Sequence, residues 1–370
     1  MLVVLVEIII VVSFSKLTSL FTSSSLLGLV LLSSIGDRVA AEKTLQVDPA
    51  YLTPTYPASP PPPRQQPLPN QRRQIENIEE TDFSVKALQA DYTGNLWVGY
   101  GRGLTRINPH TGEILARVNL PNRAIGAMVQ DKVGRLWVGS YEGLKRVDPR
   151  SNEITAQNLF LPSKRVLSLQ VDRRGYVWAG TDSGLALISP DEGLIMTTLK
   201  KLPGVSANAM TMDAQGHLWV GTLDGLVRVN TANAFVIKQI KDLPGTTVQT
   251  LAIDSLGLIW AGTPNNLLVI NPKTGAILRS VTSLRGRNVT SISFAKDKSV
   301  WVGTDNGLLR LNPYTGAVLD QVAGLPSSRI ISIAPDVGNK LWIGTSEGLA
   351  WLMPKMEKAK PHLAFTRAVQ

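Results

Sequence analysis

The sequence predicts an all-β fold, namely a seven-bladed β-propeller whose blades are four-stranded antiparallel sheets. Two observations carry this prediction. Tryptophans recur in one register, and the apolar stretches around them are short and separated by Gly, Asn and Pro, as in chains of β-hairpins. The steps between the tryptophans are 40 and then 41 residues, at Trp97, Trp137, Trp178, Trp219, Trp260, Trp301 and Trp342. Because a period in the forties marks an array of small sheets, seven copies predict seven blades.

Each copy carries the same frame, and Asp213–Leu226 shows it most cleanly: Asp-x-x-Gly-x-Leu-Trp-Val-Gly-Thr-x-x-Gly-Leu. Four strands fit each period. In the fifth blade they are expected at Val248–Ile253, Leu258–Gly262, Leu267–Asn271 and Ala276–Val281.

The glycine of the first turn is replaced in two copies, by Lys298 in the sixth and Asn339 in the seventh. Asn tolerates a left-handed backbone better than most residues, whereas Lys does not. The turn at Lys298 is therefore expected to be of another type.

The innermost strand of each copy predicts how the blades meet. Ten residues before each tryptophan the side chain is small, at Ala87, Ala127, Ser168, Ala209, Thr250, Ser291 and Ser332. Nine residues before, it is large and apolar, at Leu88, Met128, Leu169, Met210, Leu251, Ile292 and Ile333. Blades that converge on an axis leave little room on one face, and the other face fills the gap to the neighbouring sheet. The tryptophan strand is apolar on both sides, which is typical of a strand buried between two others.

The ends of the array predict how the ring closes. The last copy has no outer fourth strand in the repeat pattern after Leu349–Met353, and the first copy begins with its inner strand at Phe83. Arg73–Ile78 lies just before that strand. We therefore expect this N-terminal segment to complete the last blade and to leave no open edge.

The N-terminal region predicts export. Residues 1–41 are interpreted as a signal peptide or a membrane anchor, because Leu17–Leu32 is apolar and Val39–Ala41 has a small-x-small pattern. Both interpretations place the propeller outside the cytoplasm. The protein is expected to be periplasmic or secreted, with or without an N-terminal membrane anchor.

The other parts of the chain follow from composition. Residues 42–71 form a Pro-rich linker, with nine prolines from Pro49 to Pro69, which favours an extended tether. The propeller is assigned to residues 72–354, and a basic C-terminal tail to residues 355–370.

Composition also narrows the function. The 370 residues contain no cysteine, which excludes a thiol nucleophile and a cysteine-based zinc site. The net charge is +10. Export argues against a nucleic-acid partner, so an envelope glycan or an acidic protein is expected, with a sensor kinase or a membrane as further candidates. The protein is expected to be a monomer.

No catalytic, metal-binding or cofactor-binding set emerges from the residues. His110 and His217 belong to blades nearly opposite each other across the ring, and the third histidine, His362, is in the tail. The aspartates that recur at the first turn are expected to cap backbone N–H groups there. They are Asp91, Asp131, Asp172, Asp213, Asp254 and Asp336. The seven tryptophans are expected in the core. Carboxylates from different blades meeting in the central channel remain an alternative.

The expected binding surface is the face where the second-to-third-strand turns and the blade-to-blade connections emerge together. These loops vary between copies and mix charge with Tyr and Arg, which is typical of a binding face. The candidate ligand-binding residues are Tyr100, Arg102, Arg123, Tyr141, Glu142, Lys164, Arg165, Asp182, Asp224, Arg285, Arg287, Asp305, Arg329 and Glu347.

The repeated frame, with an Asn-Pro-x-Thr-Gly turn after it, resembles the two-component regulator propeller repeat of bacteria. Asp213–Val229 and Trp301–Gly316 match it closely, and the resemblance covers about Phe83–Met353. It implies a periplasmic, ligand-sensing propeller of the kind attached to a histidine kinase, with oligosaccharide-type ligands for many members. No kinase segment follows the repeats in this sequence.

These observations favour a non-enzymatic, exported propeller that binds a ligand or a protein through its variable loops, as a sensor, scaffold or envelope adaptor. Two alternatives stay open. Streptogramin lyase-like proteins have similar Gly-x-x-Trp repeats, and that resemblance implies an enzyme with a His and Glu constellation and bound magnesium near the channel. The other alternative is a structural spacer without a partner.

Overall fold

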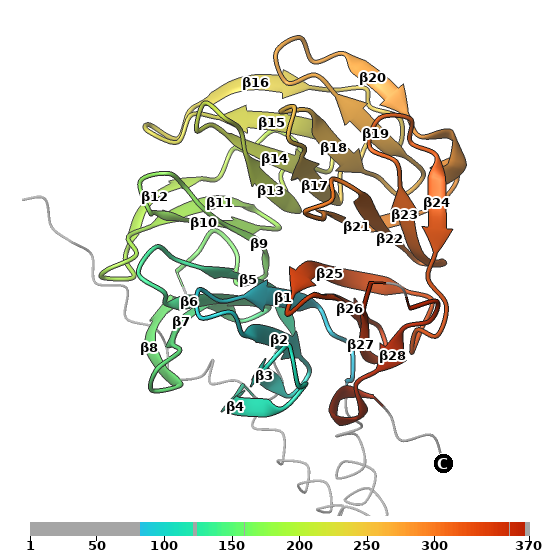
Figure 1. Cartoon of the computed structure of the whole chain (residues 1–370). Coiled ribbons are helices and arrows are strands. Elements are labelled where there is room, and N and C mark those ends of the chain that lie inside the picture. The colour runs from blue at the N-terminus through green and yellow to red at the C-terminus, as the bar shows by residue number, and fades with distance from the viewer. Residues whose placement is uncertain (1–81, 121–123, 159, 355, 367–370) are drawn as a thin grey trace, which may run out of the picture. The chain divides into compact units, whose positions relative to one another are not determined.

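The chain folds as a seven-bladed β-propeller in a computed structural model that describes residues 82–120, 124–158, 160–354 and 356–366. Within these ranges the strands form seven sheets of four antiparallel strands each. The sheets are arranged around a central axis (Figure 1). In each blade the strands follow one another in chain order from the innermost to the outermost. No helix in the described ranges is long and apolar enough to cross a membrane.

The first four blades have the following strands. Blade one has β1 (Ala87–Ala90), β2 (Leu96–Tyr100), β3 (Gly103–Ile107) and β4 (Ile114–Asn119). Blade two has β5 (Ile125–Gln130), β6 (Leu136–Ser140), β7 (Gly143–Asp148) and β8 (Glu153–Asn158). Blade three has β9 (Val166–Val171), β10 (Val177–Thr181), β11 (Gly184–Ile188) and β12 (Ile195–Leu199). Blade four has β13 (Ala209–Met212), β14 (Leu218–Thr222), β15 (Gly225–Val229) and β16 (Val236–Ile240).

The last three blades repeat the arrangement. Blade five has β17 (Thr250–Ile253), β18 (Ile259–Gly262), β19 (Leu267–Ile270) and β20 (Ile277–Ser280), all inside the ranges expected from the sequence. Blade six has β21 (Val289–Phe294), β22 (Val300–Thr304), β23 (Gly307–Leu311) and β24 (Val318–Gln321), and a short 3₁₀ turn, η2 (Thr282–Leu284), precedes it. Blade seven has β25 (Ile330–Val337), β26 (Lys340–Thr345), β27 (Gly348–Leu352) and β28 (Lys360–Pro361), followed by η3 (Leu363–Phe365).

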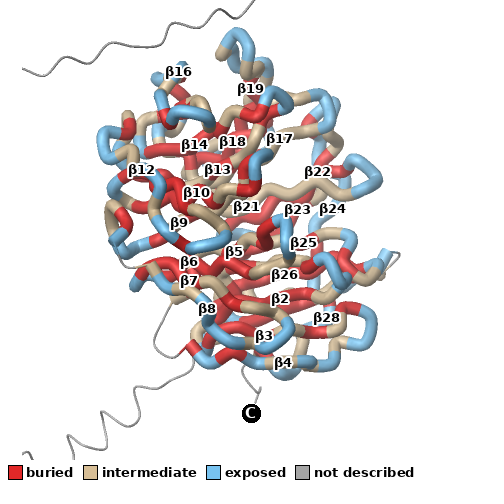
Figure 2. Tube along the Cα trace, turned by 90° about the vertical axis from the view of Figure 1, so that its left-hand side faces the viewer, coloured by how far each residue is buried: buried red, intermediate tan, exposed pale blue. Residues whose placement is uncertain are grey.

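The tryptophan strands form the core of the ring. Every residue of β2, β6, β10, β14, β18, β22 and β26 is buried, as the apolar pattern predicted. Burial is concentrated along the strands and exposure along the loops (Figure 2). The glycine two residues after each tryptophan lets neighbouring blades approach. A Cβ on Gly139 or Gly221 would lie 2.4 Å or 2.7 Å from the Val166 or Val248 side chain of the next blade.

Five of the six recurring aspartates cap their turns and also bind the tryptophans. Asp336 departs from the expectation: it accepts the backbone N–H of Lys296 in blade six at 2.6 Å, and Trp342 donates to the Val337 carbonyl instead. In blade four, Asp213 accepts the backbone N–H groups of Gln215 and His217 with one oxygen and the Trp219 indole N–H at 3.1 Å with the other. The Arg228 guanidinium lies 2.7 Å from Asp213 and 5.6 Å from the centre of the Trp219 ring. The same Trp-to-Asp bond occurs in blades one, two, three and five. The aspartate therefore joins turn, core ring and outer arginine in one unit.

This unit predicts acid sensitivity. Burial on its own would raise the pKa of Asp213, but the backbone N–H of His217, the guanidinium of Arg228 and the indole of Trp219 outweigh it and lower the pKa below its ordinary value. A lowered folded-state pKa stabilises the fold above the unfolded-state pKa, and this contribution is lost as pH falls through the folded-state value. Asp213→Asn should lower the free energy of unfolding by about 1.5–3 kcal/mol at neutral pH. Urea denaturation should show the difference from wild type shrinking at acidic pH; an equal difference at every pH would contradict it.

The ring closes differently from the expectation. The outermost strand of blade seven is β28, which pairs with Ala350 and Trp351 of β27. The position predicted for Arg73–Ile78 is thus filled from the C-terminal side, and Arg73–Ile78 itself lies outside the described residues. The prediction missed β28 because this strand has only two residues and carries none of the repeat's signature.

The inner closure uses the same backbone contact as the junctions between blades three and four, four and five, and five and six. The Val85 N–H of blade one donates to the Thr345 carbonyl of blade seven at 3.0 Å, as Ala207 N–H does to Thr181 between blades three and four at 2.8 Å. The Ser332 hydroxyl adds a bond to the Val85 carbonyl at 3.0 Å. Blades seven and one therefore meet as two consecutive blades do.

The turn at Lys298 is of the same type as the glycine turns, which corrects the expectation for this residue. Lys298 has a φ of +67° and donates its N–H to the Ala295 carbonyl at 2.9 Å. Gly94 makes the equivalent bond to Asp91 at 3.0 Å with a φ of +82°. The geometry of the hairpin overrides the local preference of Lys.

Candidate functional site

The antiparallel order of the strands sorts the loops onto two faces. The turns between first and second strands and between third and fourth strands share one face, which carries the recurring aspartates and is called the aspartate face below. The second-to-third-strand turns and the blade-to-blade connections share the opposite face, called the variable-loop face.

On the variable-loop face, the inner strands surround a cavity of about 350 Å³. Six of its lining residues occupy one register position, eleven residues before the tryptophan of their blade: Lys86, Gly126, Leu167, Asn208, Thr290 and Ile331. Tyr141, Arg329 and Ile330 complete the lining. Since the position is shared by inner strands around the ring, the cavity is the mouth of the central channel.

Cationic groups gather around Tyr141 at this mouth. The Arg165 guanidinium lies 4.7 Å from the centre of the Tyr141 ring, and the Lys86 ammonium lies 5.7 Å from it. Lys86 also lies 3.5 Å from Asp82. Arg165 and Arg329 are exposed, and Tyr141 is 43% exposed. Two residues predicted from the loops, Tyr141 and Arg165, are therefore in contact, and a third, Arg329, lines the same cavity.

The other predicted residues are spread around the rim of the variable-loop face. Exposed side chains are those of Arg102, Glu142, Lys164, Arg285, Asp305 and Glu347, while Asp182, Asp224 and Arg287 are partly buried. Asp224 lies 3.5 Å from Lys241. Arg123 lies outside the described residues. Tyr100 is 8% exposed and packs edge-on against Phe365 at 5.2 Å, so its side chain belongs to the core.

Sequence reasoning overlooked Lys86, Asn208 and Thr290. Lys86 and Asn208 directly precede the inner strands β1 and β13, and Thr290 lies in β21; this part of the repeat was interpreted only through its small and large side chains. Their shared spacing of eleven residues before a tryptophan was the available signal. Asn208 and Thr290 also bond the next blade through the Val248 and Ile330 carbonyls, at 3.1 Å and 2.6 Å.

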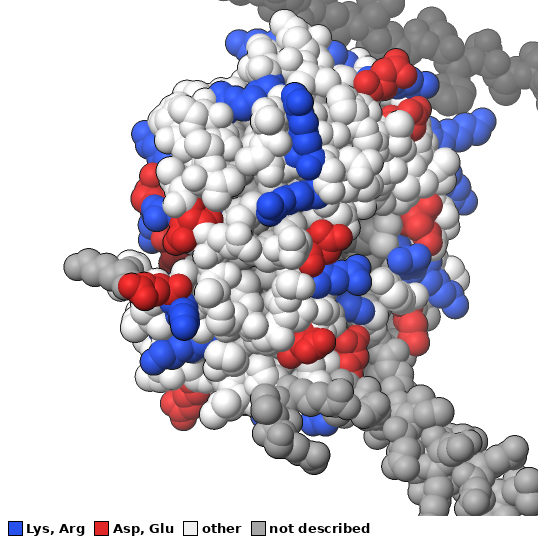
Figure 3. Space-filling model, turned by 90° about the vertical axis from the view of Figure 1, so that its right-hand side faces the viewer, with Lys and Arg blue, Asp and Glu red and all other residues white. Residues whose placement is uncertain are grey.

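Charge on one side of the ring is mixed. The side of the ring that carries β24 shows basic and acidic side chains interspersed, without a large area of one sign (Figure 3).

The three histidines have separate surroundings on the aspartate face and near the closing segment. His217 lies 3.5 Å from Asp213 and 2.8 Å from the Arg228 guanidinium. His362 bonds the Gly112 carbonyl at 2.8 Å, and its ring lies 5.0 Å from Phe365. His110 is exposed. Within the described ranges, no group of three or more His, Asp or Glu side chains has the arrangement of a metal site.

Solved structures resemble this fold at low sequence identity. The extracellular domain of a protein assigned as a one component system from B. thetaiotaomicron matches with a TM-score of 0.64 and 21% identity, over 74% of this chain and 38% of that domain. Another extracellular domain from B. thetaiotaomicron, assigned to a hybrid two component system, matches with a TM-score of 0.62 and 20% identity, over 73% of this chain and 40% of that domain. This chain thus spans well under half the length of either domain. The similarity shows the fold.

A third similar structure is an enzyme. Catalytically inactive virginiamycin B lyase from Staphylococcus aureus, solved with quinupristin, matches with a TM-score of 0.63 and 16% identity, over 72% of this chain and 94% of the lyase. This likeness too concerns the fold alone. No curated protein matches the chain.

The family comparison agrees with the repeat frame. The family described as two component regulator propeller matches residues 119–142, 161–183 and 201–224. Each matched stretch ends in the turn between the second and third strands of blades two, three and four. The chain is therefore a seven-bladed propeller in which three of the repeats match the two component regulator propeller family.

Proposed function

We propose that this chain is a non-enzymatic, exported propeller that binds an anionic ligand at the channel mouth of its variable-loop face, as a sensor, scaffold or envelope adaptor. The observation that carries the proposal is the pair Lys86 and Arg165 around Tyr141, at a cavity of about 350 Å³ that Arg329 also lines. A cavity of this volume is within the range of about 300–1,000 Å³ that is usual for small-molecule sites.

The chemistry of the cluster favours negative charge. Arginine presents a planar fork of N–H donors that matches carboxylate, sulfate or phosphate groups. Tyr141 offers a rigid ring with a polar tip, which suits a sugar or a peptide side chain. Acidic glycans of the envelope combine both features, and an acidic protein surface is the alternative occupant.

The sensor role is supported by the likeness to extracellular domains of assigned one component and hybrid two component systems. Export is supported by the same likeness and by the apolar N-terminal sequence. The lyase alternative is supported only by the shared fold.

A glycan array tests the proposal. The full chain is expected to bind oligosaccharides that carry uronic acid or sulfate groups and to ignore neutral ones of the same length. Binding should weaken as salt is raised, because the contacts are ionic and partly exposed. Preference for neutral glycans, or binding that salt leaves unchanged, would contradict an anion site. If no glycan binds, an acidic protein is the remaining occupant, and cross-linking in an envelope fraction should place it at Tyr141.

A further inference from the structure

An arginine recurs at one position of the repeat on the aspartate face, and this recurring arrangement is called the arginine template below. In four blades the residue nine positions after the tryptophan is an arginine whose guanidinium lies over the indole ring, 5.6–5.8 Å from its centre: Arg106, Arg146, Arg228 and Arg310. In blade one this guanidinium also pairs with Asp91 at 3.1 Å, and in blade four with Asp213 at 2.7 Å. Four of the aspartates that bond a tryptophan have an arginine partner: Asp91, Asp131, Asp172 and Asp213.

Blade five departs from this template. Its residue nine positions after the tryptophan is Val269, which is paired with Trp260 in the strand register and is 2% exposed. Asp254 still accepts the N–H groups of Leu256 and Leu258 and the indole of Trp260. No lysine or arginine in the described ranges lies within 4.0 Å of the Asp254 carboxylate. The carboxylate thus lacks the cation that its four equivalents have.

Arg279 makes the contact with the next blade that the template arginine makes in blade one, but not the contact with the aspartate. It stands beside Val269 on the outermost strand, and its guanidinium donates to the Pro313 carbonyl of blade six at 3.0 Å. Arg106 makes the same bridge to the Pro149 carbonyl of blade two at 3.2 Å. Arg279 therefore links blades five and six but leaves Asp254 without a cationic partner.

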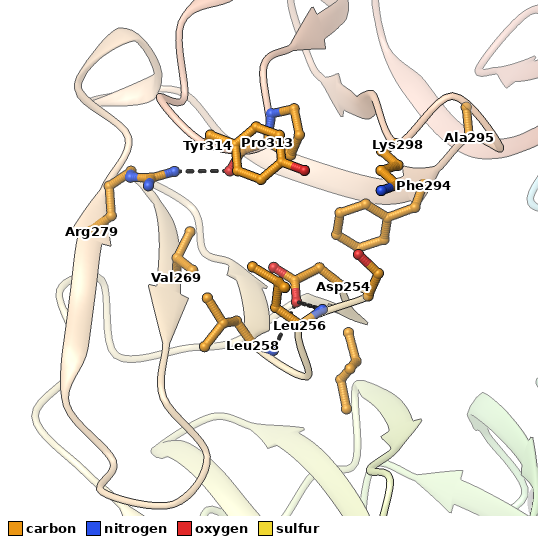
Figure 4. A pocket seen from close by; sticks show the side chains of 12 residues that line it. Asp254, Leu256, Leu258, Val269, Arg279, Phe294, Ala295, Lys298, Pro313 and Tyr314 are labelled. Carbon is orange, nitrogen blue, oxygen red and sulfur yellow. Dashed lines mark hydrogen bonds between the residues drawn. The ribbon is translucent and has the colours of Figure 1, made fainter.

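A cavity of about 180 Å³ occupies the space in front of Asp254 (Figure 4). Its walls include the rings of Phe294 and Tyr314 and the side chain of Leu256. Leu256 is 70% exposed and Tyr314 is 60% exposed, so the mouth is open to solvent. Phe294 stands edge-on to Trp260, with the ring centres 5.8 Å apart.

The cavity is lined by side chains of both charges. Asp254 is its one carboxylate, and Arg279 and Lys298 are its two cations. A bare anion would meet Asp254, and a bare cation would meet Arg279 and Lys298. A ligand with a positive group at one end and a negative group at the other satisfies all three.

We propose that this cavity binds a small zwitterion of the basic amino-acid type. Its guanidinium or ammonium group pairs with Asp254, in the role that Arg106 and Arg228 have in their blades. Its carboxylate lies toward Arg279 and Lys298, and its aliphatic stem contacts Leu256 and the rings of Phe294 and Tyr314. The site is on the face opposite the channel mouth and is independent of the function proposed there.

Isothermal titration with L-arginine and L-lysine tests this site on the full chain. The decisive variant is Val269→Arg, which supplies the arginine that the template has in this position. It should keep the fold, because four blades carry arginine there, and should weaken L-arginine binding by about tenfold or more. Leu187→Arg is the matched control: it makes the same kind of change in blade three, where Asp172 already has Arg174 as its partner at 2.7 Å. Binding in Leu187→Arg should equal that of wild type.

Two further ligands resolve what the cavity recognises. Agmatine has the guanidinium of arginine but no carboxylate, and should bind more weakly than L-arginine. An arginine-containing peptide with blocked ends reports whether a protein side chain is the natural source. Equal or tighter binding of agmatine or the blocked peptide would overturn the assignment of a carboxylate subsite. Absence of L-arginine binding, or unchanged binding in Val269→Arg, would overturn the site itself.

Discussion

Trp219→Ala is expected to lower the free energy of unfolding by about 3–5 kcal/mol, the usual cost of removing a buried aromatic ring. Trp219 is fully buried in the core between blades four and five, and its indole N–H donates to Asp213 at 3.1 Å. The substitution leaves a cavity and also removes a donor from a carboxylate that is 5% exposed. Equilibrium urea denaturation followed by circular dichroism measures the loss.

Trp219→Phe separates the two contributions. Phenylalanine keeps most of the ring but has no N–H group, so the loss should fall to about 1.5–3 kcal/mol, the range for a hydrogen bond to a charged group. Were alanine and phenylalanine equally tolerated at this position, the ring would not be the core element that its burial indicates.

Phe365→Ala is expected to be nearly as costly, although Phe365 lies outside the repeat. Its side chain is 1% exposed and contacts the rings of Tyr100 at 5.2 Å and His362 at 5.0 Å. Because Tyr100 belongs to blade one and β28 to blade seven, Phe365 joins the first blade to the last. A loss of about 3–5 kcal/mol is expected, and thermal unfolding should show a lower midpoint.

Leu363→Ala is the control for this prediction. Leu363 is two residues away and 89% exposed, so its loss should change stability by no more than about 0.5 kcal/mol. Similar midpoints for the two variants would mean that residues 356–366 do not close the ring in solution.

The sequence was sufficient to predict the strands and turns of the blades because their pattern recurs in every copy. The tryptophans report the blade count, and the apolar pattern on both sides of their strands predicts the burial found in all seven. Closure was missed because β28 depends on two residues of backbone pairing and on Phe365, which lies in no repeat. Such a contact leaves no periodic trace in the sequence.

The candidate site was predictable only in part, for a similar reason. Loop position predicted Tyr141, Arg165 and Arg329. In the structure Tyr141 and Arg329 line one cavity, and Arg165 contacts Tyr141. It could not separate Tyr100 from them, because the ring that buries Tyr100 comes from residue 365. The cavity on the aspartate face could be identified only once the fold was known, because its lining comes from two blades. Val269 stands where an arginine recurs, but its meaning depends on Asp254 being adjacent in space.

One measurement tests the central claim, that the channel mouth of the variable-loop face is where this propeller binds. The triple variant Lys86→Glu, Arg165→Glu and Arg329→Glu reverses the charge of the mouth, and Lys132→Glu, Lys273→Glu and Lys296→Glu makes the same net change on the aspartate face. All three lysines of the second set are exposed. On the array of acidic oligosaccharides, the account predicts that the first variant loses binding while the second retains that of wild type. Equal binding by both variants, or loss only in the second, would contradict it.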